Sequence, residues 1–264
     1  MIASDQVQRF REAGYLIVDD LLTAEECAEL NEHAWLTVEG KVPLGNGDGV
    51  WMEQAAIDKG LITEDEKKPE YLSKIGHRMH MKEGVFNKYT VHRKMVSVLQ
   101  QLIGSDVKCI QSMFLDKPPG LGVGQPYHQD SYYLKTDPET LLAAWIACDD
   151  ADPENGGLFV VPGSHHDPVQ PHEEPVDPTQ RNVAASYVEV RSARSRREQA
   201  VPLKAGSAVF FPGHMLHRSG HNRTDRRRRA FALHYANAKS RWLNDPTALY
   251  PFLSVCGREY PGCL

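Results

Sequence analysis

The sequence of 264 residues contains no uninterrupted apolar run near the roughly 18 residues that a membrane-spanning helix needs. Its first residues, MIASDQVQRF, hold neither an apolar segment nor a cleavage motif, so we expect no secretory signal. Lys and Arg (30) nearly balance Asp and Glu (35), and the net charge of −5 argues against nucleic acid or an anionic membrane as partner. The five cysteines are scattered without metal-ligand spacing, which predicts reduced thiols in a cytoplasmic protein.

The composition, with 41% hydrophobic and 25% charged residues, is that of a folded globular protein. The sequence pattern changes near residue 106, from helical spacing of apolar residues to short apolar runs separated by Gly, Pro, Asn and Asp. Such runs predict an all-β sandwich or barrel. We therefore expect one domain over residues 1–264, with helical support over about 1–105, a β core over about 106–240 and a tail over 241–264.

Capping signals and apolar spacing predict the individual elements. We expect helices over 4–13, 23–39, 57–72 and 85–102, a strand over 15–18, and a loop over 44–49. We expect strands over 107–115, 141–148, 158–161, 201–211 and 229–236. Residues 162–198, rich in proline and arginine, form a long insertion, either a functional lid or a disordered surface segment.

A metal-ligand pattern occurs at Tyr127-His128-Gln129-Asp130. Residues two apart on a strand share a face, so His128 and Asp130 can direct an imidazole and a carboxylate to one point. Further along, His217 follows an apolar strand and a Pro-Gly turn. Two histidines and one carboxylate form the facial triad of non-haem Fe(II) oxygenases. His214 competes with His217 for this position.

Four ordered motifs make the chain similar to a known family. They are the opening Phe10 to Val18, His-Gln-Asp at 128–130, Asn-Gly-Gly-Leu-Phe-Val-Val-Pro-Gly-Ser-His at 155–165, and His217 to Arg228. Together they resemble the phytanoyl-CoA dioxygenase family of Fe(II)- and 2-oxoglutarate-dependent oxygenases over most of residues 5–240. The resemblance implies a mainly β fold with N-terminal helices, a double-stranded β-helix or cupin-like jelly-roll.

The resemblance also implies roles for single residues. His128, Asp130 and His217 would be catalytic iron ligands, and Arg228 would pair with the distal carboxylate of 2-oxoglutarate. A guanidinium suits that task because it binds a carboxylate with two hydrogen bonds and stays charged. Ser219, Lys74, Met113 and Trp145 would also lie around the cosubstrate.

Strand alternation separates Arg228 from its neighbour Arg229. Arg228, Ala230, Ala232 and His234 share one face of the strand at 228–235, and Arg229 lies on the other. The small alanines beside Arg228 leave room for a diacid. Because Arg229 lies on the opposite face of the strand, we expect it to point away from the site.

Other residues carry weaker predictions. Trp51, Tyr132 and Tyr133 are candidates for the substrate pocket. We expect three further histidines to be solvated: His165, His166 and His221. We also expect the arginine-rich turn around Arg228 to be solvated, except for Arg228 itself. The arginines of 181–198 either clamp an anionic substrate or are solvated.

The predicted function is a dioxygenase that hydroxylates a small organic molecule while 2-oxoglutarate and O₂ become succinate and CO₂. Related halogenases lack the carboxylate ligand, so Asp130 favours hydroxylation, although desaturation, epoxidation and rearrangement stay open. The alternatives are the same chemistry on an acyl-CoA thioester, a non-catalytic jelly-roll binding module, and a zinc hydrolase, which has no use for Arg228. No protein partner is predicted.

Overall fold

A computed structural model describes residues 2–45, 48–180, 188–244 and 252–264. The α-helices are α1 (Ser4–Ala13), α2 (Ala24–Val38), α3 (Gln54–Asp58), α4 (Val85–Thr90) and α5 (Arg93–Ile103). The N-terminal strands are β1 (Leu16–Val18), β2 (Gly49–Met52), β3 (Leu72–His77), β4 (Val107–Lys117), β5 (Gln125–His128), β6 (Thr136–Asp137) and β7 (Leu142–Ala147). The remaining strands are β8 (Leu158–Val160), β9 (Gln199–Val201), β10 (Ala208–Pro212), β11 (His217–Ser219), β12 (Arg228–Asn237), β13 (Arg241–Trp242) and β14 (Leu253–Cys256). No helix in the described ranges combines the length and apolarity needed to cross a bilayer.

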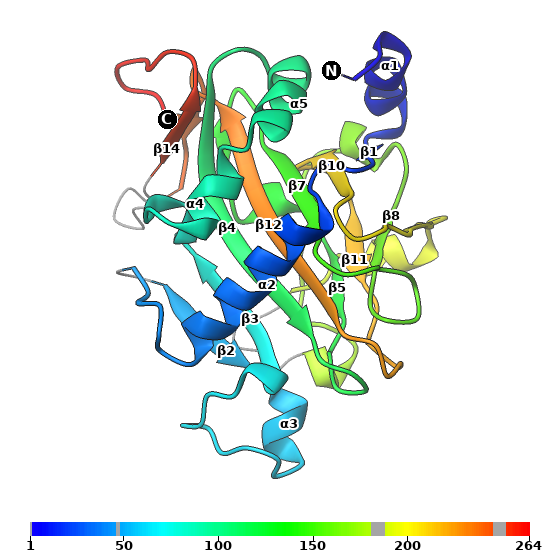
Figure 1. The fold of residues 1–264 in the computed structure, drawn as a ribbon. Coiled ribbons are helices and arrows are strands. Elements are labelled where there is room, and N and C mark those ends of the chain that lie inside the picture. The colour runs from blue at the N-terminus through cyan, green and yellow to red at the C-terminus, as the bar shows by residue number, and fades with distance from the viewer. Residues whose placement is uncertain (1, 46–47, 181–187, 245–251) are drawn as a thin grey trace.

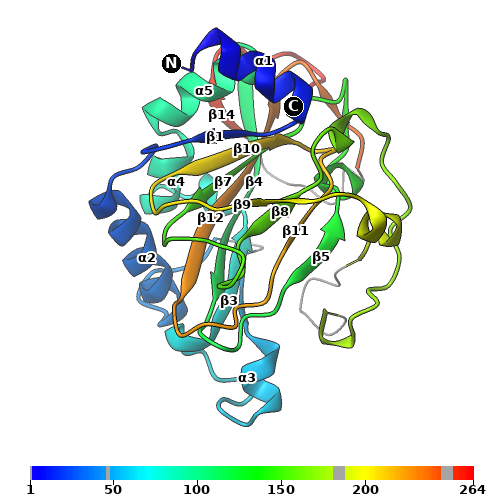
Figure 2. The ribbon, with the colours of Figure 1, turned by 90° about the vertical axis from the view of Figure 1, so that its right-hand side faces the viewer.

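Two antiparallel sheets form the core (Figure 2). The larger has the order β1-β10-β7-β12-β4-β3-β2, with β14 added beside β4, and the smaller has the order β5-β11-β8-β9. The sheets are open at their edges, as in the predicted jelly-roll. The long strands β12 and β4 pair along their full length and form the floor on which the site is built.

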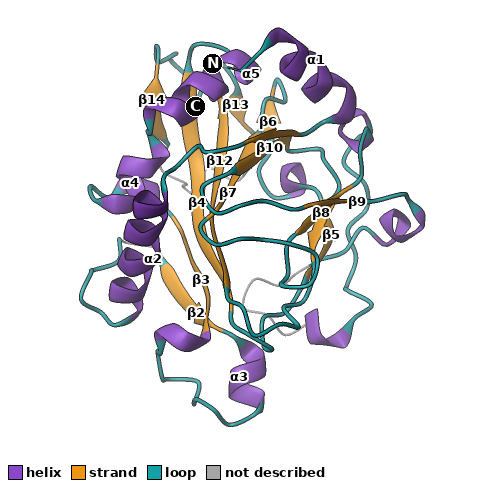
Figure 3. Ribbon diagram, turned by 45° about the vertical axis from the view of Figure 1, so that its right-hand side comes forward, coloured by secondary structure: helices purple, strands orange, loops and turns teal. Residues whose placement is uncertain are grey.

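Helices α2, α4 and α5 cover the outer face of the larger sheet (Figures 1 and 3). In α2 the buried residues Cys27, Leu30, Ala34 and Val38 recur every three or four positions, the spacing of one helix face. They belong to the same core cluster as Phe231 and Tyr235 of β12. The outer face of β12 is therefore apolar, and its inner face is left for polar residues.

Several local predictions are confirmed by hydrogen bonds and backbone angles. Thr23 and Glu26 form the predicted capping box, with the Glu26 N–H donating to Thr23 Oγ1 at 3.2 Å and the Thr23 N–H donating to Glu26 Oε2 at 2.9 Å. Gly14 ends α1 with φ of 82°, in the left-handed region that favours glycine.

The helix predicted over 57–72 is wrong. Helix α3 ends at Asp58, Gly60 has a positive φ of 67°, and Pro69 begins a short 3₁₀ helix before strand β3. Leu72 and Ile75 of β3 are fully buried because the strand pairs with β4 inside the larger sheet. Tertiary pairing overrides the helical composition here.

The helix predicted over 85–102 is two helices. The hydroxyl of Tyr235 donates to the Thr90 carbonyl oxygen at 2.8 Å, which gives this carbonyl a partner outside the helix. His92 then adopts an extended conformation and α5 begins at Arg93. The predicted 201–211 strand is likewise two strands, β9 and β10, which lie in different sheets.

Strands also occur where none was predicted. Strand β2 overlaps the expected loop over 44–49 and continues through Met52, and β14 lies in the expected C-terminal tail. In the 162–198 insertion, residues 181–187 lie outside the described ranges. Arg191, Arg194 and Arg196 pair there with Glu173, Glu189 and Asp167, so insertion carboxylates already neutralise these arginines.

Candidate active site

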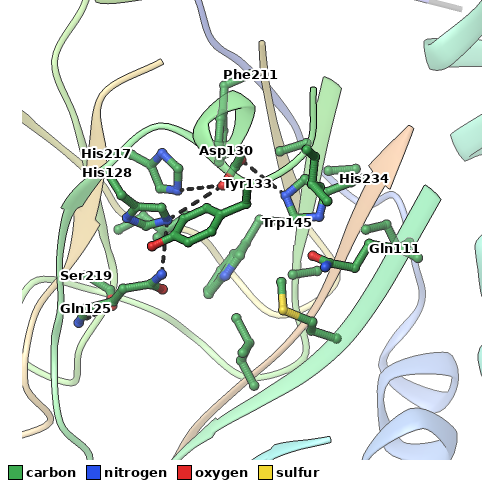
Figure 4. A pocket seen from close by; sticks show the side chains of 18 of the residues that line it. Gln111, Gln125, His128, Asp130, Tyr133, Trp145, Phe211, His217, Ser219 and His234 are labelled. Atoms are coloured by element: carbon green, nitrogen blue, oxygen red, sulfur yellow. Dashed lines mark hydrogen bonds and ion pairs between the residues drawn. The ribbon is translucent and has the colours of Figure 1, made fainter. Parts of the chain in front are cut away.

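A cavity of about 260 Å³ lies between the two sheets. Its walls come from the inner faces of both sheets and from the loop after β5. The lining includes Lys74, Gln111, Met113, Gln125, His128, Asp130, Tyr133, Trp145, His217, Ser219, Arg228 and His234 (Figure 4). Nine of the eleven site residues predicted from the sequence line this cavity, and Trp51 and Tyr132 do not.

His128, Asp130 and His217 converge at one end of this cavity. His128 and His217 are cross-strand partners in β5 and β11, and one ligand atom from each of the three residues lies within 4.8 Å of the others. One detail of the prediction is wrong: β5 ends at His128, and Asp130 opens a 3₁₀ helix over Asp130–Tyr132 instead of continuing the strand. The turn still directs its carboxylate toward both imidazoles.

The hydrogen bonds fix which nitrogen each imidazole presents. His128 Nδ1 lies 2.9 Å from the Pro126 carbonyl oxygen, and His217 Nδ1 lies 3.0 Å from the Met215 carbonyl oxygen. A carbonyl oxygen only accepts, so each Nδ1 carries the hydrogen and each Nε2 presents a lone pair. The Gln125 amide nitrogen, 3.0 Å from His128 Nε2, is a donor to that lone pair. Imidazoles that present an Nε2 lone pair are what a divalent metal requires.

Burial and neighbouring charge shift the pKa values of two members of this set, His128 and Asp130. Burial, together with the charge of His217, lowers the pKa of His128 to about 3. Burial alone would raise the pKa of Asp130, but the nearby His217 and His234 outweigh it and lower that pKa. Two imidazoles and one carboxylate therefore face one point, and this donor set fits Fe(II).

Arg228 lies deeper in the same cavity. Only 2% of the residue is exposed, and its guanidinium carbon lies 5.4 Å from the centre of the Trp145 ring. Its neighbours on the inner face of β12, Ala230 and Ala232, are small and buried, as predicted.

The other arginines of the turn point elsewhere, each to an aspartate. Arg226 pairs with Asp152 at 2.7 Å, Arg227 with Asp116 at 2.8 Å, and Arg229 with Asp149 at 2.8 Å. The prediction that Arg229 points away from the site is confirmed.

Ser219 lies two residues beyond His217 on β11 and also lines the cavity. Its hydroxyl oxygen accepts from Lys117 Nζ at 2.7 Å and from the Gln125 N–H at 3.2 Å. With both donors directed at the oxygen, the Ser219 hydrogen is available for a ligand in the cavity.

Lys117 is buried at the end of β4, where its Nζ contacts the Ser219 hydroxyl. Burial and the charge of Arg228 lower the pKa of Lys117 well below its ordinary range, and Glu53 opposes this shift. Glu53 is 2% exposed, and burial raises its pKa to about 7. Lys117, Arg228 and Glu53 thus form one buried cluster of ionisable groups beside Ser219.

Lys74 and Met113 line the middle of the cavity, on β3 and β4. Lys74 is 6% exposed, and its ammonium lies 4.7 Å from the centre of the Trp51 ring. Burial lowers the pKa of Lys74 to about 8. No described carboxylate pairs with this ammonium.

The three residues predicted for the substrate pocket separate. Tyr133 lines the cavity, with its ring 6.3 Å from that of His128. Tyr132 stacks on His172 at 4.0 Å and Trp51 packs behind Lys74 and against His77, and neither of them is among the residues that line the cavity.

Three histidines that are alternative ligand candidates lie apart from the triad. His214 Nε2 is 4.0 Å from Glu139, His165 Nε2 contacts the Arg11 carbonyl, and His221 Nε2 lies 3.3 Å from Asp177. In the described part of the chain, the triad is the one group of three with metal-ligand spacing.

Sequence reasoning gave no role to three residues of this region, Lys117, Gln111 and His234. Alternation along β4 carries the signal for the first two, because Gln111, Met113, Leu115 and Lys117 share a face. His234 was placed on the inner face of its strand, but nothing in the sequence indicated that it reaches Asp130.

The family model named phytanoyl-CoA dioxygenase (PhyH) matches residues 10–230. The chain belongs to the phytanoyl-CoA dioxygenase family. A curated family member, phytanoyl-CoA dioxygenase domain-containing protein 1 of Danio rerio, is 27% identical over 267 residues, which cover 91% of this chain and 92% of the relative.

Solved structures share the fold of this chain. The non-haem α-ketoglutarate-dependent carbocyclase SnoK from nogalamycin biosynthesis aligns with a TM-score of 0.68 and 22% identity, covering 97% of this chain and 94% of SnoK. The non-haem monooxygenase ThoJ aligns with a TM-score of 0.70 and 21% identity, covering 98% of this chain and 86% of ThoJ. The predicted jelly-roll is therefore confirmed.

Proposed function

We propose that this protein is an Fe(II)- and 2-oxoglutarate-dependent dioxygenase that hydroxylates an unactivated C–H bond of a small organic molecule. One observation carries the proposal: a buried His-Asp-His set with both Nε2 lone pairs turned inward shares its cavity with the buried Arg228. A metal site alone would fit several enzyme classes, but a buried guanidinium in the same cavity calls for an anionic cosubstrate. Family membership supports the same reaction class.

The residues divide into a metal end and an acid end. His128, Asp130 and His217 would hold Fe(II). Arg228 and Ser219 would hold the distal carboxylate of 2-oxoglutarate, with Trp145 and Met113 packing against its chain and Lys74 adding positive charge. Iron and 2-oxoglutarate would supply O₂ activation, with release of succinate and CO₂.

The chain's own contribution is positioning and protection. Carbonyl oxygens of Pro126 and Met215 hold the two imidazoles in the ligating tautomer, and Lys117 directs the Ser219 hydroxyl into the cavity. The apolar walls, which include Phe211, Leu158 and Leu134, keep water from the reacting atoms. Asp130 occupies the position that a halide would need, so hydroxylation is the outcome we propose.

Cavity size and lining support a small substrate. A cavity of about 260 Å³ that also holds the cosubstrate leaves room for a small molecule or for the reacting end of a longer one. Among the described residues that line the cavity, Asp130 is the one carboxylate, and the proposed metal uses it. A cationic substrate would find no acid to pair with, so we propose an uncharged or anionic substrate. In an acyl-CoA ester, the alternative substrate, the nucleotide would stay outside.

The test is a screen of small organic acids, alcohols and amides for substrate-dependent succinate release in ¹⁸O₂, with product mass as readout. A hydroxylated product carrying one ¹⁸O atom is expected with the parent protein, and none with Asp130→Ala. His221→Ala is the matched control, since His221 lies outside the triad, and it should retain turnover. Products that gain no oxygen, or equal turnover by Asp130→Ala, would contradict the proposal.

A further inference from the structure

Asp130 meets three imidazoles, and its two carboxylate oxygens meet different ones. Its Oδ1 lies 3.6 Å from His128 Nε2 and 3.7 Å from His217 Nε2, both beyond ordinary hydrogen-bond distance. Its Oδ2 lies 3.1 Å from His234 Nε2, within that distance (Figure 4). One oxygen thus faces the metal-ligand set, and the other faces a histidine outside it.

His234 comes from the larger sheet, on the inner face of β12 that also carries Arg228. It is 5% exposed. Its Nδ1 is buried with no hydrogen-bond partner among the described residues. A neutral imidazole carries one hydrogen, and the carboxylate is the acceptor within reach, so that hydrogen belongs on Nε2. Nε2 of His234 is therefore the ring nitrogen directed at Oδ2 of Asp130, at 3.1 Å, from the strand opposite the ligands.

We propose that His234 is a positioning residue that holds Oδ2 of Asp130 and so presents Oδ1 alone to the metal. The proposal rests on the metal site proposed above. A carboxylate free to rotate can bind a metal through both oxygens and occupy a coordination position that the cosubstrate or O₂ needs. A hydrogen bond to one oxygen opposes this, as partners of metal ligands do in other metal sites. Because His234 and Arg228 share a strand, β12 supports both ends of the site.

The test compares two amide side chains of different length at position 234. In His234→Gln the amide nitrogen takes the place of Nε2 and can still donate to Asp130, whereas in His234→Asn it takes the place of Nδ1 and falls short. Binding of Mn(II) is measured by the electron paramagnetic resonance of the free ion, and bound Co(II) by its visible absorption. Gln111→Leu is the control, since Gln111 is the cross-strand partner of His234 in the same cavity.

We expect His234→Asn to raise the Kd for Mn(II) by about 10- to 100-fold, the usual loss when such a partner is removed. His234→Gln should stay within about threefold of the parent, and only His234→Asn should change the Co(II) spectrum. Gln111→Leu should bind as the parent does. His234→Leu gives a second loss variant if His234→Asn does not fold, as judged by circular dichroism.

Three results would overturn the inference. They are parent-like metal affinity in both loss variants, equal losses in His234→Gln and His234→Asn, and an equal loss in Gln111→Leu. A parent protein that binds neither metal would instead contradict the proposed function, so the two failures are distinguishable.

Discussion

The ammonium of Lys117 and the hydroxyl of Ser219 meet across 2.7 Å in a buried corner of the molecule. Lys117 lies at the end of the longest inner strand, and Ser219 lies two residues after a proposed iron ligand. The contact directs a donor at the hydroxyl oxygen and leaves that hydroxyl's hydrogen for the cavity. Through this contact Lys117 is linked to β11, the strand that also carries the proposed iron ligand His217.

Replacing Lys117 by methionine should weaken 2-oxoglutarate binding and leave metal binding intact. An ordinary hydrogen bond contributes about 0.5–1.5 kcal/mol, so loss of this one should raise the Kd for 2-oxoglutarate about two- to tenfold. Calorimetric titration with Mn(II) and then 2-oxoglutarate separates the two affinities. A parent-like Kd for 2-oxoglutarate would show that the Lys117–Ser219 contact is structural only.

The affinity for 2-oxoglutarate should fall as the pH rises above about 8. Burial lowers the pKa of Lys74 to about 8, so its ammonium is charged below that pH and loses its charge above it. An anion binds the charged form, and one linked proton gives at most about a tenfold rise in Kd per pH unit. Titrations from about pH 7 to about pH 9 should show this rise in the parent and a smaller one in Lys74→Gln. Equal slopes would exclude Lys74 from cosubstrate binding.

Ionisation of Glu53 should lower the free energy of unfolding as the pH rises from 4.5 to about 7. Its pKa is 4.5 in the reference state and about 7 in the folded protein, so across this window the folded state keeps a proton that the unfolded chain has released. Rising pH therefore costs stability, by roughly 3 kcal/mol at most.

Glu53→Gln removes this dependence. Relative to the parent, the variant should gain thermal stability from about pH 5 to about pH 8, measured as the difference between the two melting temperatures at each pH. The difference isolates Glu53 from the buried histidines, which titrate in both proteins. A constant difference would mean that Glu53 is ionised in the folded state throughout.

The sequence carried the local part of the site well. Pattern and family resemblance led to His128, Asp130, His217 and Arg228, and the structure gathers them in one cavity. The alternation argument also separated Arg228 from Arg229, because side-chain direction on a strand follows from position alone.

Features that depend on tertiary partners escaped prediction. Residues 57–72 have a helical composition, but β4 recruits Leu72 and Ile75 into a strand. The helix over 85–102 breaks where the hydroxyl of Tyr235, far along the chain, binds Thr90. His234 gains its contact with Asp130 only when strands distant in sequence are brought together, so no local motif reveals it.

The most direct test is anaerobic addition of Fe(II) and 2-oxoglutarate to metal-free protein, followed by visible absorption for the charge-transfer band of the chelate. The parent should develop the band, Arg228→Met should need at least about tenfold more 2-oxoglutarate to reach it, and Arg229→Met should match the parent. No band in the parent, or equal 2-oxoglutarate demand in Arg228→Met and the parent, would contradict the account.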